Sequence, residues 1–191
     1  MKNLKFKSFV KFVNSPDFDQ ITKDSLVISD IDGVFFRGIF DPREIIGVIS
    51  KRNIKTFEKI LETGTAIWIF TNRILLFKKF PFIKQLSRSF KKITSISPEV
   101  YSDCSQFLGN ELKKYAIIMN AKKPGKESRS VVEKGINNFS TVVYIGAREL
   151  PFYFNDLKLV SNLSKTVDSE KLTFVEISQS LKGKGKEARM V

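Results

Sequence analysis

Two aspartates two residues apart, Asp30 and Asp32, end an apolar run that begins at Leu26, and Gly33 follows them. A continuous run of Leu, Val and Ile is typical of a strand buried on both faces of a sheet. We therefore expect both carboxylates at the carboxyl end of a core strand, where open α/β sheets build their sites. Two acids buried there are costly unless a cation or hydrogen bonds compensate them. The pair therefore indicates a Mg²⁺ site with room for a phosphate.

Three later apolar runs also end in polar groups. Residues 65–70 lead to Thr71 and Asn72, residues 116–119 lead to Lys122 and Lys123, and residues 141–145 lead to the segment Gly146–Asp156. Because the strands of a parallel sheet end at one edge, we expect these groups to meet the two aspartates in one crevice. Such a set suits phosphoryl transfer. One carboxyl attacks phosphorus, a second exchanges protons, a hydroxyl and an amide bind phosphoryl oxygens, and a lysine offsets charge.

Helical patterns alternate with these runs. We expect a short flap over residues 34–49, helices over 52–61, 74–92, 98–114 and 127–137, a further helical segment after Gly146, and a strand over 172–177. This alternation predicts an α/β fold: a three-layer Rossmann-like parallel sheet with helices on both faces and little or no cap domain. We expect residues 1–24 to form an N-terminal helix or arm, residues 25–178 the α/β domain, and residues 179–191 a flexible basic tail.

In order and spacing, the motifs resemble those of the haloacid dehalogenase (HAD) superfamily of phosphatases over residues 26–156. Val27–Val34 matches the first motif closely, residues 67–72 look like the second, and Lys123 before Pro124 fits the third, with Lys122 as the alternative. The resemblance implies a Mg²⁺-dependent phosphatase that hydrolyses a phosphate monoester through an aspartyl-phosphate intermediate.

The resemblance also implies a role for each motif residue. Asp30 is the expected nucleophile, Asp32 the expected acid and base, and Lys123 the expected catalytic cation. The expected substrate-binding residues are Thr71, Asn72, Arg73 and Lys122. The expected Mg²⁺ ligands are Asp30, the backbone carbonyl of Asp32, and an acid that follows the fourth strand.

The fourth motif departs from the family's pattern, because Ala147 follows Gly146 where the family usually has an aspartate. Two nearby acids, Glu149 and Asp156, are the candidates that would complete the metal site. A site that has lost one carboxylate binds Mg²⁺ more weakly, because few protein ligands hold this ion. The alternative function is therefore a weakened or inactive relative that binds a phosphorylated or nucleic-acid partner through its basic surface.

Each motif residue also has a purely structural interpretation. Asp32 and Gly33 suit a turn, and Thr71 suits a helix N-cap. Lys123 suits a surface position in a basic protein, and Glu149 and Asp156 suit a solvated helix. Each motif alone is a weak signal, and only their joint order and spacing favours the functional interpretation.

The net charge of +13 bears on the partners of the protein. Between Glu62 and Glu99 every charged residue is basic, and several phenylalanines lie among these lysines and arginines. The stretch is either a solvated helix face or a surface that attracts phosphates, nucleic acid or an anionic membrane. A nucleic-acid-binding module that uses this stretch and the tail is a third possible function. Another subunit could close an uncapped site, so an oligomer is compatible with the sequence.

Composition excludes several kinds of site. The chain has no histidine, which excludes His-based triads, His-ligated zinc and histidine general bases. Its single cysteine, Cys104, excludes an intrachain disulfide and fits a reducing compartment. No apolar run is long enough for a transmembrane helix. The reducing compartment that the single cysteine fits leads us to expect a cytoplasmic protein.

Overall fold

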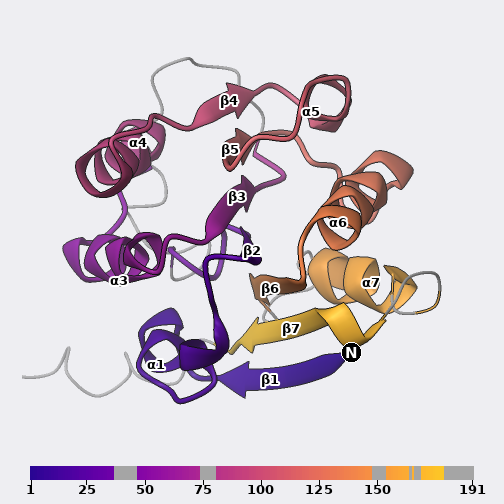
Figure 1. Cartoon of the computed structure of the whole chain (residues 1–191), viewed down its shortest axis with the longest axis horizontal. Coiled ribbons are helices and arrows are strands. Elements are labelled where there is room, and N and C mark those ends of the chain that lie inside the picture. Colours follow the sequence, from indigo (N-terminus) through magenta and orange to yellow (C-terminus); the bar gives the residue numbers. More distant parts are fainter. Residues whose placement is uncertain (37–46, 74–80, 148–153, 164, 166–168, 179–191) are drawn as a thin grey trace, which may run out of the picture.

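The sheet that the sequence predicts is present in the computed structural model of the chain, which describes residues 1–36, 47–73, 81–147, 154–163, 165 and 169–178. Its seven strands are all parallel and lie in the order β1-β7-β6-β2-β3-β5-β4 (Figure 1). They are β1 (Lys2–Phe6), β2 (Ser25–Ser29), β3 (Ala66–Phe70), β4 (Glu99–Tyr101), β5 (Tyr115–Ile118), β6 (Thr141–Ala147) and β7 (Leu172–Ile177). All residues of β2, β3 and β5 are buried, as continuous apolar runs require.

Helices cover both faces of the sheet (Figure 1). One face carries α1 (Phe9–Val13), α3 (Lys51–Glu62) and α4 (Pro81–Thr94), and the other carries α5 (Cys104–Leu108), α6 (Lys126–Asn138) and α7 (Phe154–Leu163). Two short 3-10 helices are η1 (Phe18–Gln20) and η2 (Ser169–Lys171). The predicted three-layer α/β architecture is therefore confirmed.

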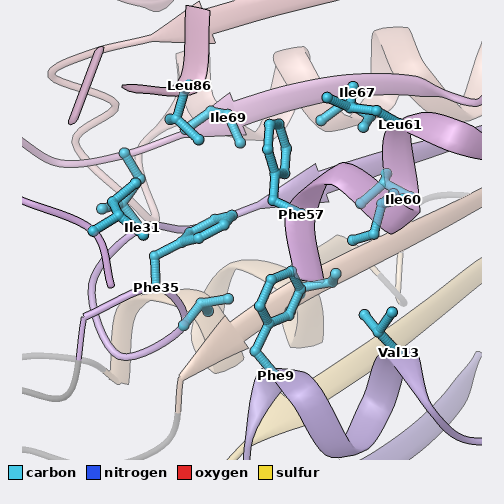
Figure 2. Close-up of a cluster of buried hydrophobic side chains, with 14 of the residues drawn as sticks. Phe9, Val13, Ile31, Phe35, Phe57, Ile60, Leu61, Ile67, Ile69 and Leu86 are labelled. Carbon is cyan, nitrogen blue, oxygen red and sulfur yellow. The ribbon is translucent and has the colours of Figure 1, made fainter. Parts of the chain in front are cut away.

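A separate apolar core fills each side of the sheet, because successive strand residues point to opposite faces. In β3, Ile67 belongs to the core under α1, α3 and α4, whereas Trp68 belongs to the core under α5, α6 and α7. The core under α1, α3 and α4 contains many of the chain's phenylalanines (Figure 2). Phe57 of α3, for example, packs edge-on against Phe35 and Phe90, with ring centroids 5.7 Å and 5.2 Å apart.

The four strands whose ends carry the motifs are neighbours in the sheet, in the order β6-β2-β3-β5. Ser29, the last residue of β2, is in register with Ile145 of β6 and Ile69 of β3. The carboxyl ends of these strands therefore lie side by side at the middle of one edge. The predicted convergence of the strand ends is confirmed.

The helix predicted over residues 98–114 is wrong. Glu99–Tyr101 forms the edge strand β4, which pairs with β5, and the short helix α5 begins only after Asp103. Asp103 caps that helix, because its side chain accepts a hydrogen bond from the backbone N–H of Gln106. Val100 and Tyr101 have side chains that favour a strand, and the open edge of β5 supplied a partner that outweighed the helix-start signal at Pro98.

The N-terminal segment contains a strand that the sequence analysis missed. β1 pairs along its whole length with β7, from Lys2 beside Thr173 to Phe6 beside Ile177, so residues 1–24 contribute to the sheet itself. Its lysines interrupt the apolar pattern, because β1 is an edge strand with exposed positions. Parts of the predicted flap (37–46) and of the predicted basic helix (74–80), and the tail (179–191), lie outside the described residues.

The described helices were also compared with the length of a membrane span. No helix in the described ranges is long and apolar enough to cross a bilayer.

Gly135 of α6 offers a test of how closely this helix approaches the sheet. A Cβ at this position would lie 2.6 Å from Cδ2 of Leu26 and 3.3 Å from Cζ3 of Trp68. Gly135→Val should therefore lower the free energy of unfolding, measured in urea, by ~1–3 kcal/mol through overpacking. Asn137→Val, at an exposed position of the same helix, is the control. Equal losses in the two variants would contradict the close approach.

Candidate active site

A buried lysine lies between two buried aspartates at the carboxyl edge of the sheet. Nζ of Lys123 is 3.1 Å from Oδ2 of Asp30 and 2.6 Å from Oδ1 of Asp156. The same ammonium donates a hydrogen bond to the carbonyl oxygen of Phe70, at 3.2 Å. The side chains are 1% exposed for Lys123, 6% for Asp30 and 2% for Asp156. Segments that follow β2, β5 and β6 thus meet at one ammonium group.

The loop that carries Lys123 is tied to the loop after β3. The N–H groups of Asn120, Ala121 and Lys123 donate hydrogen bonds to the carbonyl of Arg73, the carbonyl of Thr71 and Oδ1 of Asn72, at 2.7, 2.9 and 3.0 Å respectively. Asn120 and Lys122 both have a φ of 46°, so two left-handed residues turn the loop within a short length. These contacts fix the position of the Lys123 backbone, from which the side chain extends toward Asp30 and Asp156.

Two residues of β6 position Asp156. The hydroxyl of the buried Tyr144 donates a hydrogen bond to Oδ1 of Asp156, at 2.7 Å. A Cβ at Gly146 would lie 2.9 Å from both Cβ and Oδ2 of Asp156, so glycine is what allows α7 to come so close. The sequence analysis missed Tyr144. Its signal was a phenol in an otherwise aliphatic strand, since a buried tyrosine hydroxyl normally has a partner.

Burial and mutual charge shift the pKa values of this cluster. Burial raises the pKa of Asp30 well above its ordinary value, and the charge of Asp156 raises it further, although Lys123 lowers it. Burial lowers the pKa of Lys123, but Asp156 and Asp30 outweigh it and hold this pKa above its ordinary value. Burial and then Asp156 raise the pKa of Tyr144. At neutral pH Lys123 is therefore charged, Tyr144 is a neutral donor, and two acids face one cation.

A second ion pair lies at the same strand ends and is more exposed. Arg73 grips Asp32 with two nitrogens: Nε is 3.0 Å from Oδ1 and 3.3 Å from Oδ2, and Nη2 is 2.7 Å from Oδ1. The two side chains are 22% and 15% exposed. The guanidinium also stacks over the ring of Phe36, 4.8 Å from its centroid. Sequence reasoning selected both residues but missed that they pair.

The other predicted substrate-binding residues are arranged unevenly. Thr71 is fully buried, and its Oγ1 accepts a hydrogen bond from the N–H of Arg73 at 3.2 Å. Asn72 and Lys122 are exposed. Lys123 is buried, which contradicts its structural interpretation as a surface lysine, and so is Asp156, which contradicts the solvated-helix interpretation. Glu149 lies outside the described residues.

Ala147 stands where the resemblance led us to expect an aspartate, and little space surrounds it. Ala147 packs against the turn after β2, where a Cβ at Gly33 would lie 2.3 Å from Cβ of Ala147. Gly33 has a φ of 74°, which also favours glycine. The space in front of residue 147 is therefore filled by the turn after β2, and the acid that faces Asp30 across Lys123 comes from α7.

The donor chemistry of the cluster suits Mg²⁺, which prefers oxygen ligands and is held by one or two carboxylates with waters and phosphate. Asp30 and Asp156 supply two buried carboxylates, and a divalent cation would offset their net negative charge with Lys123. Within the described ranges, no group of three or more Asp, Glu or Cys side chains could hold a metal.

Comparisons with known proteins do not identify the chain. No protein-family model, curated protein or solved structure matches it. The resemblance to the HAD superfamily therefore stays an expectation that rests on the motifs quoted above.

The raised pKa of Asp30 has a consequence for stability. Its folded-state pKa lies above the ordinary value of 3.8, so above pH 3.8 the folded state binds more protons than the unfolded state. The contribution of Asp30 to the free energy of unfolding therefore falls as the pH rises above 3.8. Asp30→Asn, which cannot ionise, should be more stable than wild type at neutral pH when urea unfolding is measured in EDTA.

The exposed Asp24 provides the control. Asp24→Asn should follow the wild-type pH profile. If the free energy of unfolding changes with pH in the same way in wild type and in Asp30→Asn, burial does not disfavour the ionised carboxylate of Asp30.

Proposed function

We propose that this protein is a Mg²⁺-dependent phosphatase of the HAD type that hydrolyses a phosphate monoester through an aspartyl-phosphate. The observation that carries the proposal is the contact between Asp30 and the buried Lys123, with Asp32 two residues away on the more exposed side. A nucleophile with a fixed ammonium beside it, and a carboxyl nearer to solvent, are the parts that the reaction needs.

The chemistry divides between the two aspartates. An Oδ atom of Asp30 attacks phosphorus, the bond from phosphorus to the alcohol oxygen breaks, and protonated Asp32 gives its proton to the departing oxygen. Asp32 then takes a proton from a water whose oxygen attacks phosphorus. The bond between phosphorus and Asp30 breaks, and phosphate leaves with both carboxyls restored.

The remaining residues bind and orient. Lys123 offsets the charge that builds on Asp30 and the phosphoryl group, and Tyr144 acts through Asp156 to hold Lys123 in place. Thr71, Asn72 and Lys122 belong to the loops that flank the nucleophile and are proposed to bind phosphoryl oxygens.

The proposed Mg²⁺ site uses Asp30, the backbone carbonyl of Asp32 and Asp156, with Glu149 as a further candidate ligand. Mg²⁺ bound there would supply positive charge to the phosphoryl oxygens and would keep Asp30 ionised against the effect of burial.

Arg73 gives the site a way to respond to substrate. Its guanidinium contacts both oxygens of Asp32, and a phosphate can form the same two-point pair with this planar group. We propose that the substrate phosphate takes Arg73 from Asp32, which leaves Asp32 able to carry a proton.

The same ion pair supports a second candidate function, an inactive relative that binds a phosphorylated partner. If Arg73 stays on Asp32, no acid is available and the site binds without turnover. Calorimetry with Mg²⁺ separates the candidates: the enzyme requires binding that Asp30→Asn abolishes, and the inactive relative does not.

The compartment remains the expectation drawn from the sequence. Cys104 is a buried free thiol whose pKa burial raises to about 12, so it is unreactive. We propose a reducing, cytoplasmic setting.

Turnover is the first prediction of the proposal. With Mg²⁺, the protein should release phosphate from a generic monoester such as p-nitrophenyl phosphate, and EDTA should stop the release. Asp30→Asn should abolish it, because an amide is not a nucleophile here, whereas Asp24→Asn should not change it. Absence of turnover over a broad panel of phosphate esters would argue strongly against the phosphatase.

Arg73 gives the second prediction. A hydrogen bond to a charged group contributes ~1.5–3 kcal/mol, so Arg73→Ala should raise KM and the inhibition constant of inorganic phosphate about 10- to 100-fold. Lys23→Ala removes an exposed cation before β2, at the opposite edge of the sheet, and is the matched control. Unchanged phosphate inhibition in Arg73→Ala would remove this residue from the substrate site.

A further inference from the structure

Nine of the thirteen basic residues of the described α-helices lie on one face of the sheet. Helices α1, α3 and α4 carry Lys11, Lys51, Arg52, Lys55, Lys59, Lys84, Arg88, Lys91 and Lys92 against Glu58 and Glu62. Helices α5, α6 and α7 carry Lys126, Arg129, Lys134 and Lys158 against Glu127, Glu133 and Asp156. A general excess of lysine in the composition would load both layers alike, so the asymmetry indicates a directed surface.

The α3–α4 surface, defined by the basic residues of these two helices, is barely neutralised. All of its lysines and arginines are exposed. Of these lysines and arginines, only Lys92 forms an ion pair within the described part of the chain, with Glu58 at 3.2 Å. Glu58 also accepts a hydrogen bond from Ser89. Lys59 donates a hydrogen bond to Oδ1 of Asn14, at 3.1 Å. In the described part of the chain, the cations other than Lys92 have no acidic partner, so their charges are available to an anionic ligand.

The cations form two neighbouring rows. Lys51, Lys55 and Lys59 are spaced four residues apart and share one face of α3. Lys84, Arg88 and Lys91 do the same on α4, at spacings of four and three residues. The two helices run side by side, as Figure 1 shows.

Hydrogen bonds and one ion pair hold the two helices together. The side chain of Gln85 exchanges two hydrogen bonds with the backbone of Ile49, just before α3, at 2.7 and 3.1 Å. Further along, Ser89 and Lys92 of α4 contact Glu58 of α3. The two helices, and therefore the backbone positions of the two rows, are held side by side.

The dimensions suit a polyphosphate. Each row is about 10–12 Å long, because an α-helix rises about 1.5 Å per residue. A nucleic-acid duplex carries one charge per about 1.7 Å of axis, so this length presents about seven phosphates. The two rows hold six exposed cations, and Arg52 and Lys92 lie on the same helices, so the surface approaches that density.

The aromatic and apolar side chains of these helices indicate which kind of anionic partner the surface suits. All aromatic residues of α1, α3 and α4 are buried, so these helices offer no stacking platform for single-stranded bases. The exposed large apolar residues of the described chain are Met1, Ile96, Val100 and Leu112, none of them on these helices, so the surface has nothing to insert into a bilayer. We propose that the α3–α4 surface binds the phosphate backbone of double-stranded nucleic acid without sequence specificity.

The test compares two triple variants with the same loss of charge. Lys55→Gln/Arg88→Gln/Lys91→Gln alters the surface, and Lys23→Gln/Lys126→Gln/Lys158→Gln alters exposed lysines elsewhere. Binding of the full chain to short mixed-sequence duplexes of DNA and of RNA is measured by fluorescence anisotropy over a series of salt concentrations. Thermal unfolding establishes that both variants are folded, and no step requires phosphatase activity.

Wild type and the control variant should bind with a steep salt dependence, near a slope of about −3.6 if four phosphates are contacted. The surface variant should bind at least tenfold more weakly, and its slope should be shallower by up to about 2.7, since each contact contributes about 0.9. The DNA and RNA arms identify which duplex is preferred. Equal losses in both variants, a slope near zero, or tighter binding to single strands or anionic vesicles would overturn the proposal.

Discussion

The structure of this site depends on keeping one ammonium group charged in the interior. Lys123 has two buried carboxylates and a backbone carbonyl as its partners. A buried charge that is left without any partner typically costs about 3–5 kcal/mol, so Lys123 needs at least one of these carboxylates. The three segments that follow β2, β5 and β6 must therefore arrive at the same point. The hydrogen bonds between the loops after β3 and β5 and the close packing of Asp156 on Gly146 serve that requirement.

The cluster holds one more acid than base. Two acids share one lysine, and burial makes the ionised form of Asp30 unfavourable in the isolated protein. A bound cation would relieve that cost, so ion binding and ionisation of the proposed nucleophile are linked. The partly exposed pair of Asp32 and Arg73 differs, because both side chains reach solvent and a new anion can compete for the guanidinium. The site thus combines a fixed interior with an outer pair that can exchange partners.

Much of this arrangement could be read from the sequence. The apolar run before Asp30 predicted a buried strand, and the order of the later runs predicted the parallel sheet that brings Thr71 and Lys123 to the same edge. Those features depend on local patterns, which a sequence displays directly. The strand β1 did not show such a pattern, because its edge position leaves its lysines exposed.

Other features depend on tertiary choices that no local pattern specifies. Around Pro98 the helix-start signal was real, but the open edge of β5 outweighed it. The hydrogen bond from Tyr144 to Asp156 joins residues whose segments are placed by the packing of α7. The gathering of lysines on one face required knowledge of which helices share that face.

The central claim is that Asp30 forms a covalent bond to phosphorus, and direct trapping of that intermediate tests it best. The protein is mixed with Mg²⁺ and a reactive phosphate donor, quenched in acid during turnover, digested and examined by mass spectrometry. The account predicts one added phosphoryl group on Asp30 that hydroxylamine removes, and none in Asp30→Asn. Turnover with the phosphoryl group on another residue, or with no phosphorylated protein under conditions that trap such intermediates, would contradict the account.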